Sequence, residues 1–247
     1  MHRGRNEPIM SGMSASKPSI WASSAPDLRY TPDQEPCGPR RKMLERVERG
    51  AEVLDVGCWS GAAGAFLQRE RDVTVDGVEP EAAMADRAAG HYRAVYRSTV
   101  ERAMDELIAE RRNSYDALLF LDVLEHMVDP RQVLAASREL LRPGGRALVS
   151  IPNVAHWSLR YELLRGSWRY RDNGLLDRTH LRFFTRSTAH ELARESGWET
   201  TWERAALGQP PLIRLSESRL RILERWPTLF AVHFLLELRP AIRPGTA

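Results

Sequence analysis

Residues 53–64 read VLDVGCWSGAAG, and this stretch decides the fold class. The apolar run up to Val56 predicts a buried strand, and the small residues after Gly61 predict the start of a helix. Glycine at positions 57 and 61 allows a tight turn that a ligand can approach, beside the unpaired N–H groups of the helix. The stretch therefore indicates a turn that binds a nucleotide-like cofactor.

The spacing of the glycines excludes two other nucleotide-binding loops. A dinucleotide fingerprint G-x-G-x-x-G starting at Gly57 would need glycine where Trp59 and Ala62 stand. The chain also lacks the G-x-x-x-x-G-K-[ST] loop of nucleoside triphosphatases. We therefore set both of these protein classes aside.

Short apolar runs alternate with helical segments around this turn. This alternation predicts an α/β fold with a Rossmann-like, doubly wound and mainly parallel sheet. The expected strands are 52–56, 73–78, 94–96, 117–121 and 146–150. The expected helices are about 40–49, 62–69, 81–89, 100–111 and 130–141.

The pattern changes after Ile151. Residues 152–187 are rich in aromatic and Arg side chains and are expected to form an inserted lid over the substrate. The segments that follow are a helix at 186–196, a strand at 198–204, a helix at 215–225 and an apolar run at 229–238. A closing hairpin with an antiparallel last strand would complete a seven-stranded sheet. We expect residues 1–36, with five prolines, to be flexible and residues 37–247 to form one domain.

Composition restricts the class of protein. The 28% charged and 43% hydrophobic residues are typical of a compact soluble domain. A net charge of +3 is too small to indicate nucleic-acid binding. Only Cys37 and Cys58 are present, which fits a reducing compartment, and we expect a cytoplasmic protein. The apolar run at 229–238 is far short of the roughly 20 residues that span a bilayer, so we expect no membrane contact.

A second functional signal lies at the end of the strand expected at 73–78. Glu79 follows this strand directly, 24 positions after Asp55. A carboxylate at this tip lies beside the first turn, where it can accept hydrogen bonds from both hydroxyls of a ribose. A carboxylate at a strand end can also simply cap the next helix.

With these two signals, the chain resembles the class I methyltransferases that use S-adenosylmethionine. The first motif of that family, [DE]-x-G-x-G-x-G, is matched by Asp55, Gly57 and Gly61, and its acidic second-strand end by Glu79. Residues 115–126 and 140–145 extend the resemblance, which covers about residues 40–238. The resemblance implies S-adenosylmethionine as the cofactor, held by Asp55, Gly57, Cys58, Trp59, Gly61, Glu79, Pro80, Asp122 and Val123.

Later motifs point to subgroups within this family. Asp122-x-x-Glu125-His126 and the segment 151–157 are similar to ubiquinone-type O-methyltransferases and MetW-like proteins. The segment 177–185 is similar to methyltransferases of sugar and natural-product pathways. The resemblance implies methyl transfer to a hydroxyl, or less probably an amine, of a small molecule such as a sugar or secondary metabolite. A MetW-like accessory protein that acts through a partner is the alternative.

One residue departs from the family turn. Trp59 stands where the middle glycine is expected. Its indole would either narrow the methionine pocket or point outward and leave the turn able to bind. These two interpretations predict different affinities for the cofactor.

Three histidines are the candidate general bases. His126, His156 and His180 follow strands at the edge where open α/β proteins bind ligands, and we rank His180 first. The histidines set aside are His2, His91, His190 and His233. A structural hydrogen bond is the alternative role for each candidate.

The stretch Asp122, Glu125 and His126 allows another interpretation. In some ubiquinone-type relatives similar positions bind a divalent ion, but these residues could equally cap a helix or bond the cofactor. We therefore assign no metal.

The lid also carries an excess of positive charge. Seven Arg and three acidic residues between Ile151 and Thr188 give a net charge of +4, so the hypothesis is an anionic substrate that docks near Arg178 and Arg182. No Asn/Asp-Pro-Pro-aromatic motif and no long basic tract support RNA methylation, so nucleic acid is not an expected partner. A homodimer is possible.

Overall fold

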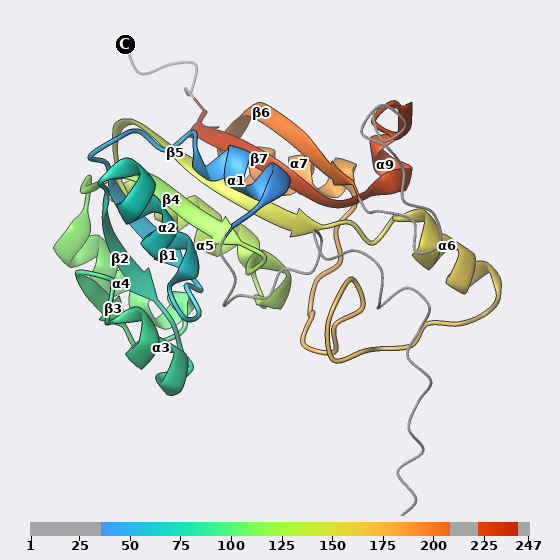
Figure 1. The fold of residues 1–247 in the computed structure, drawn as a ribbon, viewed down its shortest axis with the longest axis horizontal. Coiled ribbons are helices and arrows are strands. Elements are labelled where there is room, and N and C mark those ends of the chain that lie inside the picture. The colour runs from blue at the N-terminus through green and yellow to red at the C-terminus, as the bar shows by residue number, and fades with distance from the viewer. Residues whose placement is uncertain (1–35, 208–221, 242–247) are drawn as a thin grey trace, which may run out of the picture.

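The computed structural model describes residues 36–207 and 222–241. Its centre is one seven-stranded sheet in the order β3-β2-β1-β4-β5-β7-β6 (Figure 1). The strands are β1 (Glu52–Val56), β2 (Thr74–Val78), β3 (Ala94–Tyr96), β4 (Tyr115–Leu121), β5 (Leu141–Pro152), β6 (Trp198–Leu207) and β7 (Ala231–Pro240). Strands β1 to β5 pair in parallel, and β7 runs antiparallel to both β5 and β6. The predicted Rossmann-like sheet with an antiparallel last strand is confirmed.

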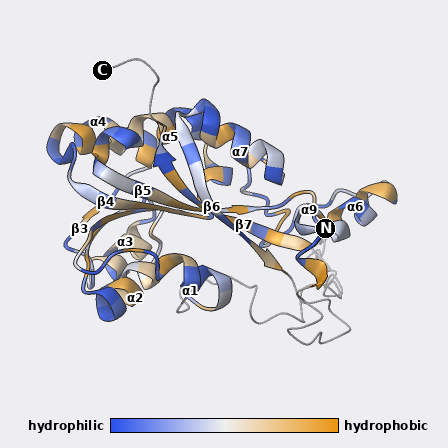
Figure 2. Ribbon diagram, turned by 90° about the horizontal axis from the view of Figure 1, so that it is seen from above, coloured by the Kyte–Doolittle hydropathy of each residue, from blue (hydrophilic) through white to orange (hydrophobic). Residues whose placement is uncertain are grey.

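Helices cover both faces of the sheet (Figure 2). One face carries α1 (Gly38–Leu44), α2 (Ala62–Arg71) and α3 (Ala82–Ala88). The other face carries α4 (Val100–Arg111), α5 (Pro130–Ser137) and α7 (Arg186–Glu195). Two further helices lie beyond the end of β5, α6 (Trp157–Leu164) and α9 (Pro227–Phe230). The 3-10 turns are η1 (Leu124–His126) and η2 (Arg138–Leu140).

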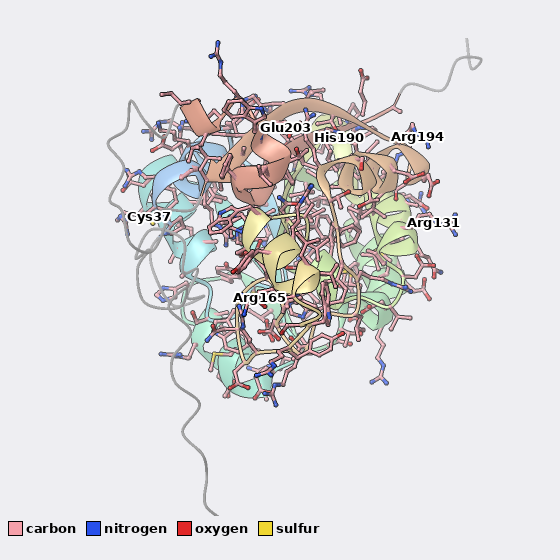
Figure 3. The ribbon with its side chains drawn as sticks, turned by 90° about the vertical axis from the view of Figure 1, so that its right-hand side faces the viewer. Cys37, Arg131, Arg165, His190, Arg194 and Glu203 are labelled. Carbon is pink, nitrogen blue, oxygen red and sulfur yellow. The ribbon has the colours of Figure 1, made fainter. Side chains whose placement is uncertain are left out.

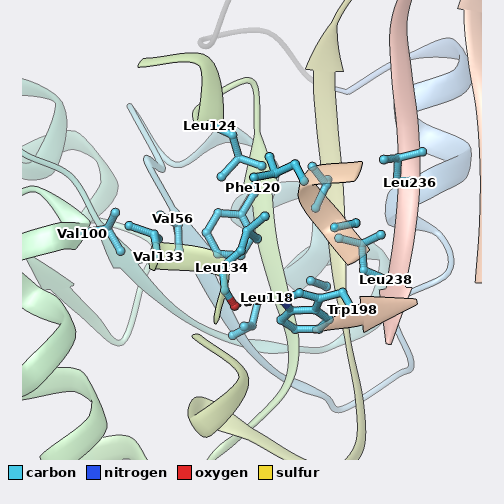
Figure 4. Close-up of a cluster of buried hydrophobic side chains, with 14 of the residues drawn as sticks. Val56, Val100, Leu118, Phe120, Leu124, Val133, Leu134, Trp198, Leu236 and Leu238 are labelled. Atoms are coloured by element: carbon cyan, nitrogen blue, oxygen red, sulfur yellow. Dashed lines mark hydrogen bonds between the residues drawn. The ribbon is translucent and has the colours of Figure 1, made fainter. Parts of the chain in front are cut away.

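Each face of the sheet has its own hydrophobic core, because side chains alternate along a strand. Leu54 and Val56 pack on the side of α4, α5 and α7, whereas Val53 packs on the side of α1 and α2. Figure 4 shows the first core, in which Trp198 lies against the inner strands. The indole of Trp198 donates to the Leu134 carbonyl at 2.8 Å, so its one polar atom is satisfied inside the core.

Several element boundaries differ from the sequence predictions; the helix expected at about 40–49, for example, is α1 and ends at Leu44. The helix expected at 130–141 ends at Ser137 and continues only as η2, and β5 begins at Leu141 rather than at 146. Gly144 adopts a positive φ of +84° inside this early part of β5, and the pairing with β4 shifts register there. The first part of β5 is therefore an irregular strand segment that contains Gly144, whereas a helix end and a tight turn were predicted there. The predicted segment 1–36 except Pro36, and most of the predicted helix 215–225, lie outside the described residues.

The pairing of β5 with β7 brings distant residues to one edge. Pro152 at the end of β5 lies opposite His233 near the start of β7. Beyond β5, the buried amide of Asn153 donates to the carbonyls of Thr228 and Ala231 at 3.1 and 2.8 Å. The segment that follows β5 therefore begins at a side chain held by two hydrogen bonds. Within the described ranges, no helix is both long and apolar enough to cross a membrane.

Candidate cofactor and catalytic site

The turn after β1 needs glycine for both conformation and space. Gly57 and Gly61 adopt φ values of +67° and +84°, which side chains rarely tolerate. A Cβ atom on Gly57 would stand 2.6 Å from Cγ2 of Val123. Val123 follows β4, so the turns after these two neighbouring strands are in contact. The structure thus brings together two of the predicted cofactor residues.

Asp55 anchors the turn through a tyrosine. The hydroxyl of Tyr92 donates to Asp55 Oδ2 at 2.6 Å and accepts from the amide of Gly64 at 3.0 Å. Burial raises the pKa of Asp55 to about 7, although the bond from Tyr92 opposes this shift. Asp55 thus holds the turn through the hydroxyl of Tyr92. No pattern in the sequence pointed to Tyr92.

Glu79 joins the first two turns. This carboxylate is 3% exposed, and it accepts from the amide of Trp59 at 2.8 Å and from the amide of Glu81 at 2.9 Å. The bond to Glu81 ties this carboxylate to the N-cap residue of α3. Each carboxylate oxygen has a second lone pair, so Glu79 can still accept from a ribose hydroxyl. The residues of both turns therefore fit the adenosine half of the cofactor.

The other predicted residues of these turns differ in exposure. Cys58 is buried, and burial raises the pKa of its thiol. Pro80 is exposed. Trp59 is 37% exposed and adopts a φ of +50°. A side chain this exposed does not form part of the core beneath the turn, which agrees with the outward interpretation.

Asp122 lies at the centre of a polar network after β4. The guanidinium of Arg40 forms an ion pair with Asp122 and donates to Ser150 Oγ at 3.1 Å, and the Ser150 hydroxyl donates to Asp122. His233 Nε2 lies 3.7 Å from Asp122 Oδ2. Burial raises the pKa of Asp122, but Arg40 and His233 outweigh it and hold this pKa well below its usual range.

Arg40 and His233 are site residues that sequence reasoning missed. The positional reason for setting His233 aside does not hold, because the antiparallel direction of β7 places its beginning at the edge where the parallel strands end. Arg40 lies on α1, 82 positions before Asp122, and no local sequence motif indicates that Arg40 belongs to the site. Only the tertiary structure brings these charges together.

Glu125, His126 and His180 form a second cluster beside this network. Glu125 is 1% exposed, and among the described residues its Oε2 has no hydrogen-bond partner. His180 Nε2 lies 4.0 Å from Glu125 Oε1, and the rings of His126 and His180 are 4.8 Å apart. Burial, together with the charge of Asp122, raises the pKa of Glu125 well above its usual value.

This cluster fastens the lid to η1. The amides of Leu181 and Arg182 donate to the carbonyl of Glu125 at 2.8 and 3.0 Å. Nδ1 of His126 lies 3.2 Å from the carbonyl of Thr179, so the exposed ring is held by the lid as well. The predicted base His180 therefore reaches the site because its segment is bonded to the turn after β4.

The metal-ligand set considered from the sequence, Asp122, Glu125 and His126, is not the cluster that the structure forms. Glu125, His126 and His180 offer three ligand atoms within 4.8 Å of one another, a carboxylate and imidazole set of the kind that divalent cations accept. Asp122 does not belong to this set, and its carboxylate forms an ion pair with Arg40. His180 takes the place that the sequence suggested for Asp122.

His156 has a structural role. It caps α6, with its Nδ1 atom 2.8 Å from Ser158 Oγ and accepting from the Ser158 amide at 3.4 Å. Burial, with a smaller effect of His233, lowers the pKa of His156 to about 4. This candidate is therefore a weaker base than a free imidazole.

The two arginines expected to grip an anion have protein partners. Arg178 forms an ion pair with Asp172 at 2.7 Å, and Arg182 Nε donates to the carbonyl of Val128 at 3.0 Å. Both side chains help to shape the lid. An anionic substrate there stays a prediction.

Comparison with known proteins places this geometry in a family. A family model described as a methyltransferase domain matches residues 29–202. The ubiquinone biosynthesis O-methyltransferase of Xylella fastidiosa (strain 9a5c) is 36% identical over 132 residues, which cover 48% of this chain and 54% of the relative. The chain thus spans about half the length of this curated relative.

Solved structures share the fold. A methyltransferase from Archaeoglobus fulgidus superposes with a TM-score of 0.57 at 17% identity, covering 81% of this chain and 90% of the other. A chain of the complex between the Haloferax volcanii Trm112 methyltransferase activator and a methyltransferase gives 0.57 at 18% identity, covering 81% and 88%. The cofactor implied by the glycine turn and Glu79 is S-adenosylmethionine. With its turn, strand order and family match taken together, the chain belongs to the class I S-adenosylmethionine-dependent methyltransferases.

Proposed function

We propose that this protein transfers a methyl group to a hydroxyl of a small molecule. The single observation that carries the proposal is the proximity of His180 to the buried Glu125, which follows the predicted cofactor residue Val123 by two positions. An oxygen acceptor loses a proton when it is methylated, and the imidazole of His180 can take it. The name of the Xylella fastidiosa relative, an O-methyltransferase, supports an oxygen acceptor.

The cofactor would be held by residues of the first two turns. Glu79 accepts from the ribose hydroxyls with its remaining lone pairs, and the glycine turn lets the adenosine approach the main chain. When bound, S-adenosylmethionine supplies an electrophilic methyl group on a sulfonium. The protein then has to position the acceptor oxygen at attack distance, which can contribute about 7 to 11 kcal/mol.

His180 is the proposed general base. Burial and the neighbouring His126 lower the pKa of His180, so its neutral form prevails near neutral pH and retains a lone pair. Glu125 Oε1 lies 4.0 Å from His180 Nε2, and the raised pKa of Glu125 means that this carboxyl adds no full negative charge beside the imidazole. His156 is less suited because its Nδ1 is committed to Ser158.

The test is turnover with a panel of hydroxyl and amine acceptors, including sugars and phenols, with mass detection of the methylated product. His180→Ala should lower kcat by roughly 100-fold or more while cofactor affinity is retained. His91→Ala, at an exposed histidine away from this edge, is the matched control and should turn over normally. Methylation of amines alone would overturn the choice of acceptor, and unchanged turnover of His180→Ala would overturn the base.

A MetW-like accessory role is the second candidate, and Trp59 is the observation that favours it. The Trp59 amide already satisfies one oxygen of Glu79, so the turn is hydrogen-bonded without a ligand. Calorimetric titration with S-adenosylmethionine separates the two functions. Micromolar binding supports the enzyme, whereas absence of binding together with co-purification of a partner protein supports the accessory role.

A further inference from the structure

The ring of Tyr92 fills a space that glycines leave beside the cofactor turn, residues 57–61. Tyr92 lies between α3 and β3 and is 6% exposed. A Cβ atom on Gly64 would stand 2.2 Å from Cε1 of this ring, and one on Gly77 would stand 2.7 Å from Cδ2. For Gly61 the distance to Cε1 would be 3.2 Å. The cofactor turn, α2 and β2 thus each contribute a glycine to the space of one phenol ring.

The hydroxyl of Tyr92 joins the two ends of the cofactor turn. It donates to Oδ2 of Asp55, which lies in β1, and accepts from the amide of Gly64, which lies in α2. Gly64 is the third residue of α2, where a main-chain N–H has no acceptor inside the helix. One hydroxyl group therefore bonds both the strand that enters the turn and the helix that leaves it. We call these two hydrogen bonds the Tyr92 bridge.

Bonds to the neighbouring strand fix the beginning of the cofactor turn. The amides of Gly57 and Cys58 donate to the carbonyl of the last residue of β2 at 2.8 and 3.1 Å. The amide of Trp59 donates to Glu79, the next residue after β2. The Tyr92 bridge adds a bond at the other end of the turn, where α2 starts.

Trp59 makes the cofactor turn dependent on such bonds. The family motif has glycine at this position, and glycine adopts a positive φ without steric penalty. Trp59 has a φ of +50°, a conformation that the Cβ atom of an ordinary residue opposes, so the surrounding structure must hold it there. A turn that contains Trp59 therefore needs its hydrogen bonds more than a turn with glycine would.

We propose that Tyr92 is a positioning residue for S-adenosylmethionine, and that its hydroxyl holds the cofactor turn in the binding conformation where Trp59 replaces the glycine of the family motif. Without the hydroxyl, Asp55 and Gly64 each lose a partner, and the start of α2 can shift relative to β1. The cofactor approaches the main chain of this turn, so such a shift weakens its binding. This role does not depend on which acceptor is methylated.

The experiment is titration calorimetry of the full chain with S-adenosylmethionine, in a double-mutant cycle of Tyr92→Phe and Trp59→Gly. Tyr92→Phe keeps the ring and removes only the hydroxyl. It should weaken binding about tenfold in the natural chain, because buried partners are left unsatisfied. In the Trp59→Gly background the same change should weaken binding about twofold or less, since glycine holds the turn without the bridge.

Three results would overturn the proposal. The first is an unchanged affinity of Tyr92→Phe, and the second is an equal loss of affinity in the natural chain and in the Trp59→Gly background. The third is absence of any binding by the natural chain, which would overturn the enzymatic function as well. Binding by the natural chain that Tyr92→Phe leaves intact would overturn the role of Tyr92 alone.

Tyr115→Phe is the matched control, because the Tyr115 hydroxyl also donates to a buried carboxylate, Asp76, at 2.8 Å. Tyr115 begins β4, at the edge of the sheet opposite to the cofactor turn. Tyr115→Phe should lower the unfolding temperature but leave cofactor affinity unchanged. Arg131→Gln, at an exposed arginine of α5 labelled in Figure 3, should change neither. Equal weakening of binding by Tyr115→Phe and Tyr92→Phe would contradict the positioning role.

Amide hydrogen exchange tests the Tyr92 bridge in the natural chain without cofactor and without substitution. The Gly64 amide should exchange slowly, because the Tyr92 hydroxyl accepts its hydrogen bond in place of a helix carbonyl. In folded Tyr92→Phe its exchange should be about tenfold faster or more. If Gly64 of the natural chain exchanged as fast as an exposed loop amide, the proposal would be overturned even if Tyr92→Phe did not fold.

Discussion

Trp59 donates its main-chain amide to Glu79 Oε2 at 2.8 Å, so one hydrogen bond joins the turns that follow β1 and β2. The bond depends on the left-handed backbone at Trp59, where φ is +50°. The departure from the family motif therefore affects the backbone of the cofactor turn as well as its surface. The free-energy cost of holding tryptophan in this backbone conformation can therefore be measured by substitution.

Trp59→Gly should stabilise the protein by about 1 kcal/mol, because glycine adopts a positive φ without steric penalty. Trp59→Ala removes the indole but retains a Cβ atom, so it should not gain this stability. Urea unfolding of the three proteins measures the difference. If both variants change stability equally, backbone strain at this position is not the cause.

Glu79→Gln should weaken S-adenosylmethionine binding at least tenfold and destabilise the fold by about 1 to 3 kcal/mol. The new amide donor would face a main-chain N–H that the carboxylate now satisfies. Titration calorimetry and chemical unfolding check the two effects. Glu81→Gln, an exposed neighbour, is the control, and equal effects in both variants would count against the role of Glu79.

Arg40→Met should cost about 3 to 5 kcal/mol, because Asp122 would be left as a largely buried charge without its main partner. Adding Asp122→Asn removes that charge and should restore at least half of the loss. Arg41→Met tests a neighbouring side chain that is 43% exposed, and it should change stability little. Additive effects of Arg40→Met and Asp122→Asn would show that the pair is not coupled.

The stability of the fold should depend on pH through Asp55. Its folded pKa of about 7 lies above its ordinary value of 3.8, so the neutral acid is favoured in the folded state. The stabilising contribution is complete below about pH 4 and is lost as the pH rises through 7, with a limit of about 4 kcal/mol. Asp55→Asn should gain stability relative to the natural chain between pH 5 and pH 8.5, and a difference independent of pH would contradict this.

Chelation tests how the Glu125 cluster works. A proton acceptor needs the lone pair of His180, whereas a metal ligand would donate it to the ion. We expect turnover to survive treatment with EDTA, and His126→Ala to keep most of the activity. Activity that is lost with EDTA and restored by one divalent metal would replace the acid–base role with a metal site formed by Glu125, His126 and His180.

The local elements could be predicted from the sequence because their signals are local. The strands at 52–56 and 94–96 and the helix at 100–111 have the predicted bounds, and the turn at 57–61 forms where glycine permits it. A run of apolar residues that is short and bounded by turn formers is sufficient for such elements. The early start of β5 was not predictable in this way, because it depends on pairing with Tyr115.

The polar networks could be predicted only in part. Asp122, Glu125 and His180 were found because they lie in motifs, but their partners Arg40 and His233 lie on elements far away in the sequence. The position of His233 depends on the direction and register of β7, which apolar periodicity does not determine. The same limit applies to Tyr92, which bonds Asp55 but lies 37 positions later in the chain, after α2, β2 and α3.

The interior position of β7 has a consequence for biosynthesis. β7 is the last strand within the described residues, yet it lies between β5 and β6 and contributes Phe234, Leu236 and Leu238 to the core. While the ribosome is still translating this strand, β5 has an open hydrogen-bonding edge and β6 has no neighbour. We therefore expect the emerging polypeptide to depend on chaperones until synthesis passes residue 240, and premature stop codons before residue 231 to yield insoluble product.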